Sequence, residues 1–443
     1  MRIGLIAMSG IRACDEELLR LGLTLPGFVE RSKAIASLPS LGLLTIAALT
    51  PRRHPVKYLE VANLGEAEVI ADRFDLVGIS TYSAQAEEAY ALADRYRATG
   101  IPVVMGGPHV SVLPDEALEH CSSVVVGHGE LHWADVVADA EDGCLQSVYG
   151  SIDDDFDLAD APMPAFDLLD IGNYNRLTVQ TSRGCSHKCE FCAGSVLFCR
   201  SYRQKPAAKV LAEVDRIRGI WPQPFIELAD DNSFVSRSYW LGLLPELARR
   251  NIRWFTETDI SVGEDDELLS LLEASGCVEL LIGLESPVRE GLDGIEPGVN
   301  WKLKKFDRYR QSLRNIQDHG IRVNGCFILG LDGHTPEIFD SVREFVSEAD
   351  LFDVQITIET PFPGTPLFAR LEREGRLLHK DQWERCTLFD VNFRPSGMTA
   401  DQLQRGFRSL AVDLYSSEWT RARRKRFIRS LRAHQNEERS TVS

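Results

Sequence analysis

Short apolar runs alternate with amphipathic stretches along most of the 443 residues, and this alternation constrains the fold more than any other feature of the sequence. In the N-terminal third these runs are rich in Val and Ile and lie at Ile3–Met8, Val56–Val61, Leu76–Ser80, Pro102–Met105 and Val124–Val126. Uninterrupted apolar runs that alternate with helices are typical of a parallel sheet covered on both faces. We therefore expect residues 1–150 to form a doubly wound α/β domain of flavodoxin-like type.

One predicted helix of this domain has a well-defined apolar face. Its core-facing positions recur at helical spacing and are Ala86, Ala89, Tyr90, Ala93 and Tyr96. Ser83 comes shortly before them, and we expect its side chain to cap the first turn of this helix.

The second half of the chain repeats the strand–helix alternation six times. Its predicted strands lie at Leu177–Thr181, Phe225–Leu228, Arg253–Thr256, Glu279–Leu284, Arg322–Leu329 and Val354–Glu359. Helical patterns intervene at Ala207–Arg218, Tyr239–Arg250, Glu267–Ala274, Asp307–His319 and Pro336–Ala349. No pattern supplies a seventh or eighth strand, so these units predict a partial (β/α)6 barrel over residues 176–366.

Two further segments flank the predicted barrel. Residues 151–175 are acidic, weakly periodic and interrupted by prolines, which predicts a linker between the domains. Residues 367–443 are expected to be largely helical, and within them Arg421–Arg432 carries seven basic side chains and no acidic one. We interpret this basic stretch as a solvated helix or an intramolecular partner for the acidic body, with contact to an anionic membrane surface as the alternative.

Composition narrows the possible classes of protein. The chain has 66 acidic and 49 basic residues, a formal net charge of −17, so a nucleic-acid partner is not expected. The longest apolar stretch, Leu38–Leu49, is too short to cross a bilayer, and we interpret the N-terminus as a first buried strand, not as a signal peptide. We therefore expect a cytoplasmic location, where the ten Cys residues serve as thiols or metal ligands.

The carboxyl ends of the N-terminal strands are an expected ligand site, because open parallel sheets bind ligands at that edge. These ends read Ser80-Thr81-Tyr82-Ser83, Gly106-Gly107-Pro108-His109 and Gly127-His128-Gly129-Glu130. Glycine allows the backbone to approach a large ligand closely, but ordinary turns between strands and helices use glycine as well. The segments by themselves leave both interpretations open.

Three thiols follow the first predicted barrel strand within a single loop. Cys185, Cys189 and Cys192 form a C-x3-C-x2-C run, which is too tight for all three to be core residues. Structural zinc and most iron–sulfur clusters use four protein ligands, so three ligands indicate a metal centre with an open coordination position. Cys199 is a candidate fourth ligand, although we favour a packed structural thiol there.

This Cys loop, with an aromatic residue before its third Cys, resembles that of the radical S-adenosylmethionine (SAM) superfamily. The ends of the later barrel strands agree with it: Asp230-Asp231-Asn232, Glu257, Glu285-Ser286, Gly330 and Pro363-Gly364-Thr365-Pro366. The resemblance implies that Cys185, Cys189 and Cys192 hold three irons of a [4Fe-4S] cluster and that SAM chelates the fourth. It further implies SAM contacts from Phe191, Asp230 or Asp231, Glu257, Glu285, Ser286 and Gly330.

Electrostatics gives the acidic strand ends a physical rationale. SAM carries a sulfonium and an ammonium group, and carboxylates stabilise such positive centres. Acidic residues are also favoured at the start of helices, so helix capping is the alternative for Asp230, Asp231 and Glu285.

The N-terminal domain resembles the cobalamin-binding class of the same superfamily, through GGPHVSVLPDEAL and VVGHGELHWADVV. The resemblance places cobalamin against Ser80, Thr81, Tyr82, Ser83, Gly106, Gly107, His109, Gly127 and Glu130. Many such domains carry Asp-x-His-x-x-Gly after the second strand, whereas Ala62 stands at the His position here. Either cobalamin binds without a His ligand from this loop or the domain has lost it, and we expect neither His109 nor His128 to ligate cobalt.

Together the resemblances imply a cobalamin-dependent radical SAM enzyme, with a small-molecule substrate and an electron donor such as flavodoxin or ferredoxin. C-methylation of an unactivated carbon, in a small molecule or natural-product intermediate, is the leading hypothesis. Radical oxidation, rearrangement or cyclisation without methyl transfer is the first alternative, and a corrinoid or redox sensor without turnover is the second. Dispersed thiols at Cys14, Cys121 and Cys144 argue against a methylthiotransferase. No catalytic side chain is assigned from the sequence.

Overall fold

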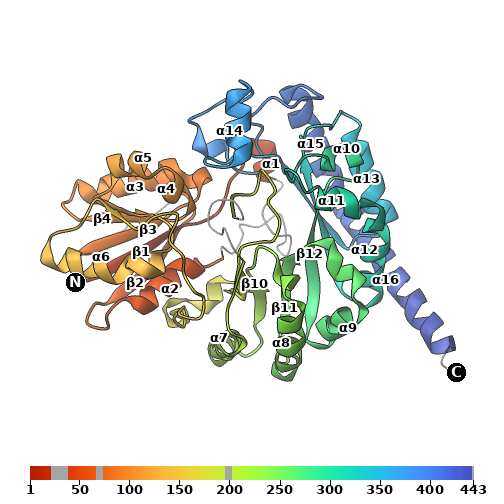
Figure 1. Cartoon of the computed structure of the whole chain (residues 1–443), viewed down its shortest axis with the longest axis horizontal. Helices are drawn as coiled ribbons and strands as arrows, with labels where there is room; N and C mark the ends of the chain where they lie inside the picture. The colour runs from red at the N-terminus through yellow and green to blue at the C-terminus, as the bar shows by residue number, and fades with distance from the viewer. Residues whose placement is uncertain (21–37, 66–72, 195–201, 442–443) are drawn as a thin grey trace.

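The computed structural model of the chain describes residues 1–20, 38–65, 73–194 and 202–441. In these residues two six-stranded parallel sheets lie in separate lobes, and a two-stranded antiparallel sheet joins the second lobe (Figure 1). The arrangement confirms the predicted α/β class, with a doubly wound domain ahead of a (β/α) domain.

The first sheet has the strand order β2-β1-β3-β4-β5-β6, which is the flavodoxin-like order extended by one strand. Its strands are β1 (Ile3–Met8), β2 (Val56–Val61), β3 (Leu76–Ser80), β4 (Val103–Gly106), β5 (Ser123–Val125) and β6 (Val148–Tyr149). Helices α2 (Leu41–Leu49) and α6 (Gly129–Asp142) pack on one face of the sheet. Helices α3 (Ala86–Arg97), α4 (Pro108–Val112) and α5 (Pro114–His120) pack on the other.

Helix α3 buries all five residues predicted for its core face. The predicted cap by Ser83 is wrong, because Ser83 opens a 3-10 turn, Ser83–Gln85, and the residue that caps α3 is Gln85, without a side-chain bond. The Ser83 hydroxyl instead lies 3.0 Å from Nδ1 of His109, a contact between distant segments that helix-start patterns do not reveal.

The second sheet has the order β14-β13-β12-β11-β10-β7, so neighbouring strands follow one another along the chain. Its strands are β7 (Leu177–Val179), β10 (Phe225–Leu228), β11 (Arg253–Thr258), β12 (Cys277–Glu285), β13 (Arg322–Leu329) and β14 (Asp353–Ile358). The outer helices include α7 (Ala207–Ile220), α8 (Arg237–Arg250), α9 (Asp266–Ala274), α12 (Tyr309–Asp318) and α13 (Ile338–Glu348). Strands β7 and β14 are not paired with each other, so the sheet is an open partial barrel.

Two short strands frame the Cys loop. Strand β8 (Ser182–Arg183) ends just before Cys185, and it pairs antiparallel with β9 (Arg203–Gln204). Asp230 fastens this hairpin to the sheet, because its carboxylate accepts from the backbone N–H groups of Thr181 (2.7 Å) and Ser182 (2.9 Å). The Cys loop therefore begins from a fixed point at the mouth of the barrel.

The remaining segments tie the two lobes together. Residues 151–175 contain only 3-10 turns, at Phe166–Leu168 and Ile171–Asn173, yet they bury Phe156 and Leu158. The C-terminal region contains α14 (Pro366–Arg373), α15 (Ala400–Tyr415) and α16 (Ser417–Thr441), with a short 3-10 helix, Trp383–Arg385, between α14 and α15. Trp383, which begins this 3-10 helix, packs into the core of the first lobe.

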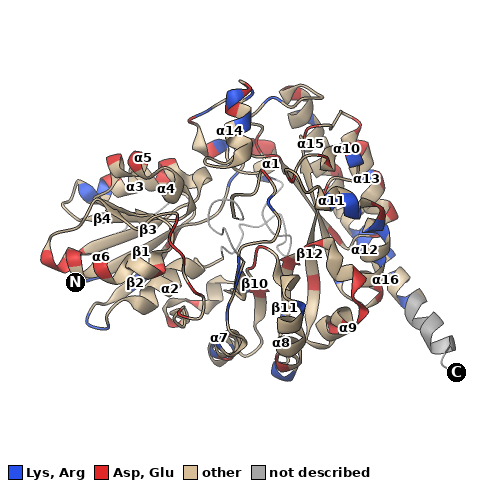
Figure 2. Cartoon of the chain, in the orientation of Figure 1, with Lys and Arg blue, Asp and Glu red and all other residues tan. Residues whose placement is uncertain are grey.

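Helix α16 docks on the barrel through part of its basic stretch (Figure 2). Arg423 is fully buried and pairs with Asp353 at 3.0 Å, and Arg426 pairs with Asp350 at 3.1 Å. These pairs support the interpretation of the stretch as an intramolecular partner for the acidic body. Across the ranges that the structure describes, we find no helix that is long and apolar enough to cross a membrane.

Candidate functional site

A cavity of about 1280 Å³ lies between the carboxyl edges of the two sheets. The first lobe lines it with strand-end residues that include Ser80, Tyr82, Gly106, Gly107 and Gly127. The second lobe lines it with residues in or beside β7, β8 and β10 and after the Cys loop, including Arg176, Gln180, Arg183, Gly194, Glu227 and Asp231. The two predicted ligand-binding edges therefore share one space.

Two glycines in the first-lobe wall of this cavity have positive φ and little room for a side chain. Gly107 has a φ of 98°, and a Cβ there would lie 2.8 Å from Oγ of Ser80. Gly127 has a φ of 77°, and a Cβ there would lie 2.4 Å from the carbonyl oxygen of Ser151. Both positions favour glycine for conformation and for space, because a side chain there would strain the backbone and collide with atoms of the first lobe itself. The cavity and its lining of glycines and small polar residues fit a corrinoid.

Not every residue predicted to contact cobalamin lines the cavity. Ser80, Tyr82, Gly106, Gly107, Gly127 and Glu130 do. Thr81, Ser83 and His109 are buried behind this wall, and His109 is fully buried. His109 lies 3.0 Å from Ser83 Oγ and 3.1 Å from Tyr90 OH, and the ring of Trp383 packs edge-on against it. It therefore supports the wall from behind.

The loop after β2 places Ala62 at the cavity, where many cobalamin domains have their His ligand. The carbonyl oxygen of Ala62 accepts a hydrogen bond from Arg12, whose guanidinium also pairs with Glu88. The described part of this loop offers no imidazole, so a corrinoid here would lack a His ligand from it.

Arg183 joins the two lobes beside the cavity. Its guanidinium donates to Nδ1 of His128 at 2.8 Å and to Oε1 of Glu130 at 2.8 Å. A guanidinium can only donate, so His128 must accept through Nδ1 and carry its proton on Nε2. Burial and the neighbouring Arg183 lower the pKa of His128. These two hydrogen bonds thus connect the segment that carries His128 and Glu130 to β8, the strand that leads into Cys185.

The three thiols of the Cys loop are shielded from solvent to different degrees. Cys189 is buried, whereas Cys185 and Cys192 are half-buried. Burial raises the pKa of the Cys185 thiol and raises that of Cys189 well above its ordinary value. Bound metal reverses this effect, because a coordinating thiol is deprotonated.

Within the described residues, no three Cys, His, Asp or Glu side chains converge closely enough to hold a single metal ion. A [4Fe-4S] cluster places each protein ligand at a separate iron. Cys199 lies outside the described residues.

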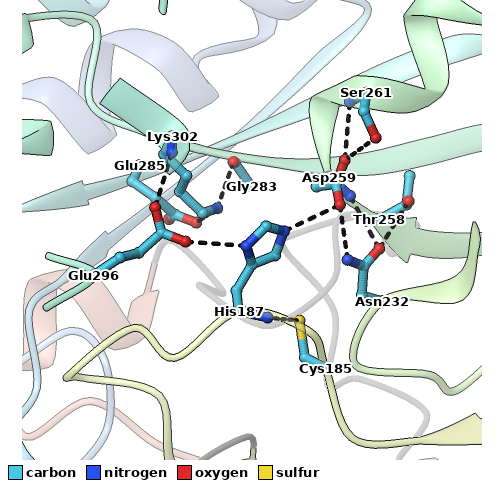
Figure 3. Close-up of polar contacts among 10 residues, drawn as sticks. All are labelled: Cys185, His187, Asn232, Thr258, Asp259, Ser261, Gly283, Glu285, Glu296 and Lys302. Carbon is cyan, nitrogen blue, oxygen red and sulfur yellow. Dashed lines mark hydrogen bonds and ion pairs between the residues drawn. The ribbon is translucent and has the colours of Figure 1, made fainter. Parts of the chain in front are cut away.

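His187, in the middle of the Cys loop, is held between two carboxylates (Figure 3). Its Nε2 lies 3.2 Å from Oδ2 of Asp259, and its Nδ1 lies 3.0 Å from Oε1 of Glu296. Burial lowers the pKa of His187, but the bonds to Asp259 and Glu296 outweigh it and raise that pKa to about 9. His187 is therefore an imidazolium at neutral pH.

The two aspartates after β10 have different surroundings. Asp230 is buried, and its oxygens accept from the backbone of Thr181 and Ser182 and from Ser233 Oγ at 3.0 Å. Asp231 lines the cavity, and its Oδ2 accepts from the backbone N–H of Gly184 at 2.8 Å. Of the two, only Asp231 is placed to meet a ligand, while Asp230 organises the hairpin before the Cys loop.

Glu285 ends β12 in an unusual conformation. Its φ is 62°, and the pairing with β13 shifts register between Gly283 and Glu285. Non-glycine residues with positive φ are uncommon and concentrate at functional sites. The buried carboxylate of Glu285 accepts from Nζ of Lys302 at 2.5 Å, which also donates to the carbonyl of Gly283 at 2.9 Å. Glu285 therefore has a cationic partner inside the protein.

Glu257 is half-buried inside the barrel among other carboxylates. Burial and the charges of Glu227, Asp231, Asp230 and Glu285 raise its pKa to about 8. Among the described residues it has no hydrogen-bond or ion-pair partner. A cationic ligand would relieve this repulsion, so the acidic interior fits the positive centres of SAM.

Of the predicted SAM contacts, Asp231 lines the cavity, whereas Asp230, Glu257, Glu285, Ser286, Gly330 and Phe191 do not. Ser286 is fully buried, and its hydroxyl lies 2.9 Å from Nε2 of His334. Gly330 has a φ of 97°, and a Cβ there would lie 2.8 Å from Leu403 and 2.9 Å from Phe393, so the C-terminal region packs against it. Phe191 is half-buried against the core of the barrel.

Sequence reasoning missed Arg183, His187, Asp259, Glu296 and Lys302. The first two could have been suspected, because they stand beside or within the C-x3-C-x2-C run. Glu296 lies between α10 (Arg289–Leu292) and α11 (Trp301–Lys305), and Lys302 lies within α11. No strand-end pattern marks either residue.

Comparison with known proteins identifies both domains. Residues 32–137 match the B12 binding domain, and residues 179–346 match the radical SAM superfamily. Residues 365–442 match a domain of unknown function, DUF4070. The matches confirm the predicted resemblance to the cobalamin-binding class of the radical SAM superfamily. The predicted cofactors (a [4Fe-4S] cluster, SAM and cobalamin) are those of these domains.

Several curated proteins are similar to most of the chain. Bacteriochlorophyllide d C-12(1)-methyltransferase of Chlorobaculum tepidum is 27% identical over 388 residues, which cover 85% of this chain and 82% of that protein. Hopanoid C-2 methylase of Rhodopseudomonas palustris is 28% identical over 369 residues, 79% of this chain and 67% of that protein. Anaerobic magnesium-protoporphyrin IX monomethyl ester cyclase of Cereibacter sphaeroides is 25% identical over 230 residues, 51% of this chain and 36% of that protein.

Among solved structures, the radical SAM methyltransferase TsrM from Kitasatospora setae has a similar fold. It superposes with a TM-score of 0.68 at 16% identity, covering 94% of this chain and 89% of that one. That structure contains cobalamin and a [4Fe-4S] cluster. The chain therefore carries a B12-binding domain at residues 32–137 ahead of a radical SAM domain at residues 179–346.

Proposed function

We propose that the protein is a cobalamin-dependent radical SAM methyltransferase that acts on an unactivated carbon of a small molecule. The observation that carries this proposal is the cavity of about 1280 Å³ shared by the carboxyl edges of the two sheets. A substrate in that space would lie between a corrinoid on the first lobe and SAM on the second. Such proximity is what group transfer between two cofactors requires.

Each cofactor has a defined set of candidate residues. Cys185, Cys189 and Cys192 would hold the cluster, and Asp231, Glu257 and Glu285 would face the positive centres of SAM. The cluster with SAM supplies radical chemistry, and cobalamin supplies methyl transfer; the protein positions them and excludes water. Gly106, Gly107 and Gly127 would let the first lobe contact the corrinoid through its backbone.

Relatives support methylation as the reaction. Two relatives that cover most of this chain are named as a methyltransferase of bacteriochlorophyllide d and a methylase of hopanoids. Cyclisation is the second candidate, because relatives that match 51% and 68% of the chain are named as cyclases. Both reactions would use the same Cys loop, so the distinction depends on methyl transfer.

The proposal can be tested without knowing the substrate. The reconstituted, reduced full chain, loaded with cobalamin, is mixed with SAM that carries a labelled methyl group. A methyltransferase produces S-adenosylhomocysteine in an amount set by the bound cobalamin, because SAM gives up its methyl group to this cofactor. A protein that holds both cofactors but forms no S-adenosylhomocysteine would instead be assigned to radical cyclisation or another reaction without methyl transfer.

A further inference from the structure

The C-terminal region, residues 365–442, matches a domain of unknown function and contacts both lobes. Its first helix, α14, lies between the two lobes at the top of Figure 1. The region also covers the free edge of β14. The N–H of Ile358 donates to the carbonyl of Leu388 at 2.7 Å, and the N–H of Ile356 donates to the hydroxyl of Tyr415 at 3.0 Å. The C-terminal region therefore closes the side on which the partial barrel is open.

One contact of this region holds the Cys loop. Arg370 on α14 donates to both carboxylate oxygens of Glu190, at 3.0 and 2.5 Å. Glu190 directly follows Cys189, and its carbonyl accepts from the backbone N–H of Leu367 at 3.1 Å. The same guanidinium donates to Asp332, which follows β13, at 2.7 Å. A bidentate arginine–carboxylate pair fixes direction as well as distance, so α14 holds the Cys loop against the barrel.

A second contact holds the first lobe. Nε1 of Trp383 donates to the carboxylate of Glu116 on α5, at 3.0 and 3.2 Å from its two oxygens. The ring of Trp383 packs edge-on against the buried His109, with 5.4 Å between the ring centroids. His109 in turn lies 3.0 Å from the hydroxyl of Ser83, the residue after the cavity residue Tyr82. Trp383 therefore supports the first-lobe wall of the cavity from behind.

We propose that the C-terminal region is a clamp that holds the Cys loop and the first-lobe wall to one support, with Arg370 and Trp383 as its positioning residues. Neither side chain lines the cavity, so neither is placed to touch a ligand there. The inference rests on the proposed function, because it assumes a cluster on the Cys loop and a corrinoid on the first lobe. It gives the C-terminal region a role of its own, since transfer between two cofactors requires that both be held in place.

The two contacts can be broken separately. Arg370→Gln should speed the release of iron from the reconstituted full chain to a chelator by roughly tenfold, because the loop loses a charged hydrogen-bond partner. Its affinity for hydroxocobalamin should not change. Trp383→Leu should weaken the binding of hydroxocobalamin by roughly threefold or more and leave the release of iron unchanged. Absorbance measures both properties.

Hydrogen exchange of the full chain without cofactors shows where each substitution acts. Arg370→Gln should speed the exchange of residues 184–192, and Trp383→Leu should speed that of residues 81–85. A substitution that merely destabilised the fold would speed exchange throughout both lobes. That uniform pattern, or unchanged exchange in both segments, would overturn the inference.

A double substitution tests whether Arg370 acts through Glu190. If it does, Glu190→Gln should speed the release of iron as much as Arg370→Gln, and the double variant should release iron no faster than either. Effects that add would mean that Arg370 acts through Asp332 instead, and they would overturn this arm of the clamp.

The matched controls are Arg373→Gln and Trp221→Leu. Arg373 is exposed on the same helix as Arg370, and Trp221 packs against the barrel core at the end of α7, so both variants should retain both cofactors like the wild type. If Arg370→Gln does not fold, Arg370→Lys decides, because an ammonium cannot replace the fork that binds two carboxylates, and release of iron at the wild-type rate would overturn the inference. A wild-type chain that retains neither cofactor would instead refute the proposed function.

Discussion

The carboxyl edges of the two sheets face one cavity but differ in chemistry. The first-lobe edge exposes hydroxyl groups and glycines, such as Ser80, Gly106 and Gly127, and its His109 is buried behind them. The second-lobe edge gathers thiols and carboxylates, of which Asp231 lines the cavity and Glu257 and Glu285 do not. In Figure 2 the sheet of the first lobe is largely tan, whereas acidic residues mark the strands of the second.

This difference indicates that the two edges receive different ligands. A wall of backbone and small side chains suits a large ligand bound by shape and many weak contacts. An interior of repelling carboxylates beside three thiols suits a cation and a metal cluster. Substitutions at one edge should therefore impair the binding of that edge's ligand and leave the other ligand bound. Four predictions follow, from the largest expected effect to the smallest.

Replacing Cys185, Cys189 and Cys192 together with Ala should abolish iron binding and the reductive cleavage of SAM. The first lobe should still bind hydroxocobalamin with wild-type affinity, since none of its wall residues is changed. Iron analysis and an absorbance titration with cobalamin measure the two outcomes. Retention of iron in the triple variant would contradict the assignment of the second edge.

Gly106→Leu should weaken cobalamin binding by roughly tenfold or more, because overfilling a packed site costs about 1–3 kcal/mol. A Cβ at this position would meet only the carbonyl oxygen of Val125 at 3.5 Å and its Cβ at 3.8 Å, so the backbone need not move. Iron content should stay unchanged. Gly219→Leu on α7, where a Cβ would meet nothing within 4 Å, is the control and should change neither property.

Arg183→Gln should destabilise the contact between the lobes by about 1–3 kcal/mol, because it leaves the Glu130 carboxylate without its charged partner. Urea unfolding of the chain without cofactors measures the change. Arg216→Gln is the matched control, since Arg216 pairs with Asp167 on the surface and should cost at most about 0.5 kcal/mol. Equal effects of the two substitutions would argue against a specific joint at Arg183.

The affinity for SAM should rise with pH between about 7 and 9. The pKa of Glu257 is raised to about 8, so this group is largely neutral at pH 7 and ionised at pH 9. A cation binds better to the ionised form, which gives an increase of at most about tenfold per pH unit. Glu257→Gln should flatten the part of the profile due to this residue. A profile identical in both proteins would place Glu257 outside the SAM site.

Much of the fold could be predicted because local sequence specifies it. The buried runs that became β1, β2 and β3 were placed at their observed bounds, and the order of six barrel units followed from their sequence alone. The short pair β8 and β9 and the 3-10 helix at Trp383–Arg385 depend on contacts between distant segments, which periodicity does not encode. The wrong cap at Ser83 has the same origin, since its hydroxyl faces His109 from another loop.

The candidate site divides in a similar way. The C-x3-C-x2-C spacing identifies Cys185, Cys189 and Cys192 because three ligands lie within one loop. The partners of that loop could not be predicted, because Asp259 and Glu296 come from elements far along the chain. Asp230 and Asp231 are adjacent in sequence, but only the fold shows that one binds backbone and the other lines the cavity.

Iron, sulfide and cobalt content of the anaerobically reconstituted full chain tests the central claim most directly. If the two edges hold a cluster and a corrinoid, each chain should retain about four irons, four sulfides and one cobalt after unbound cofactors are removed. Retention of cobalt without iron, or of iron without cobalt, would contradict the claim that both cofactors meet at one cavity.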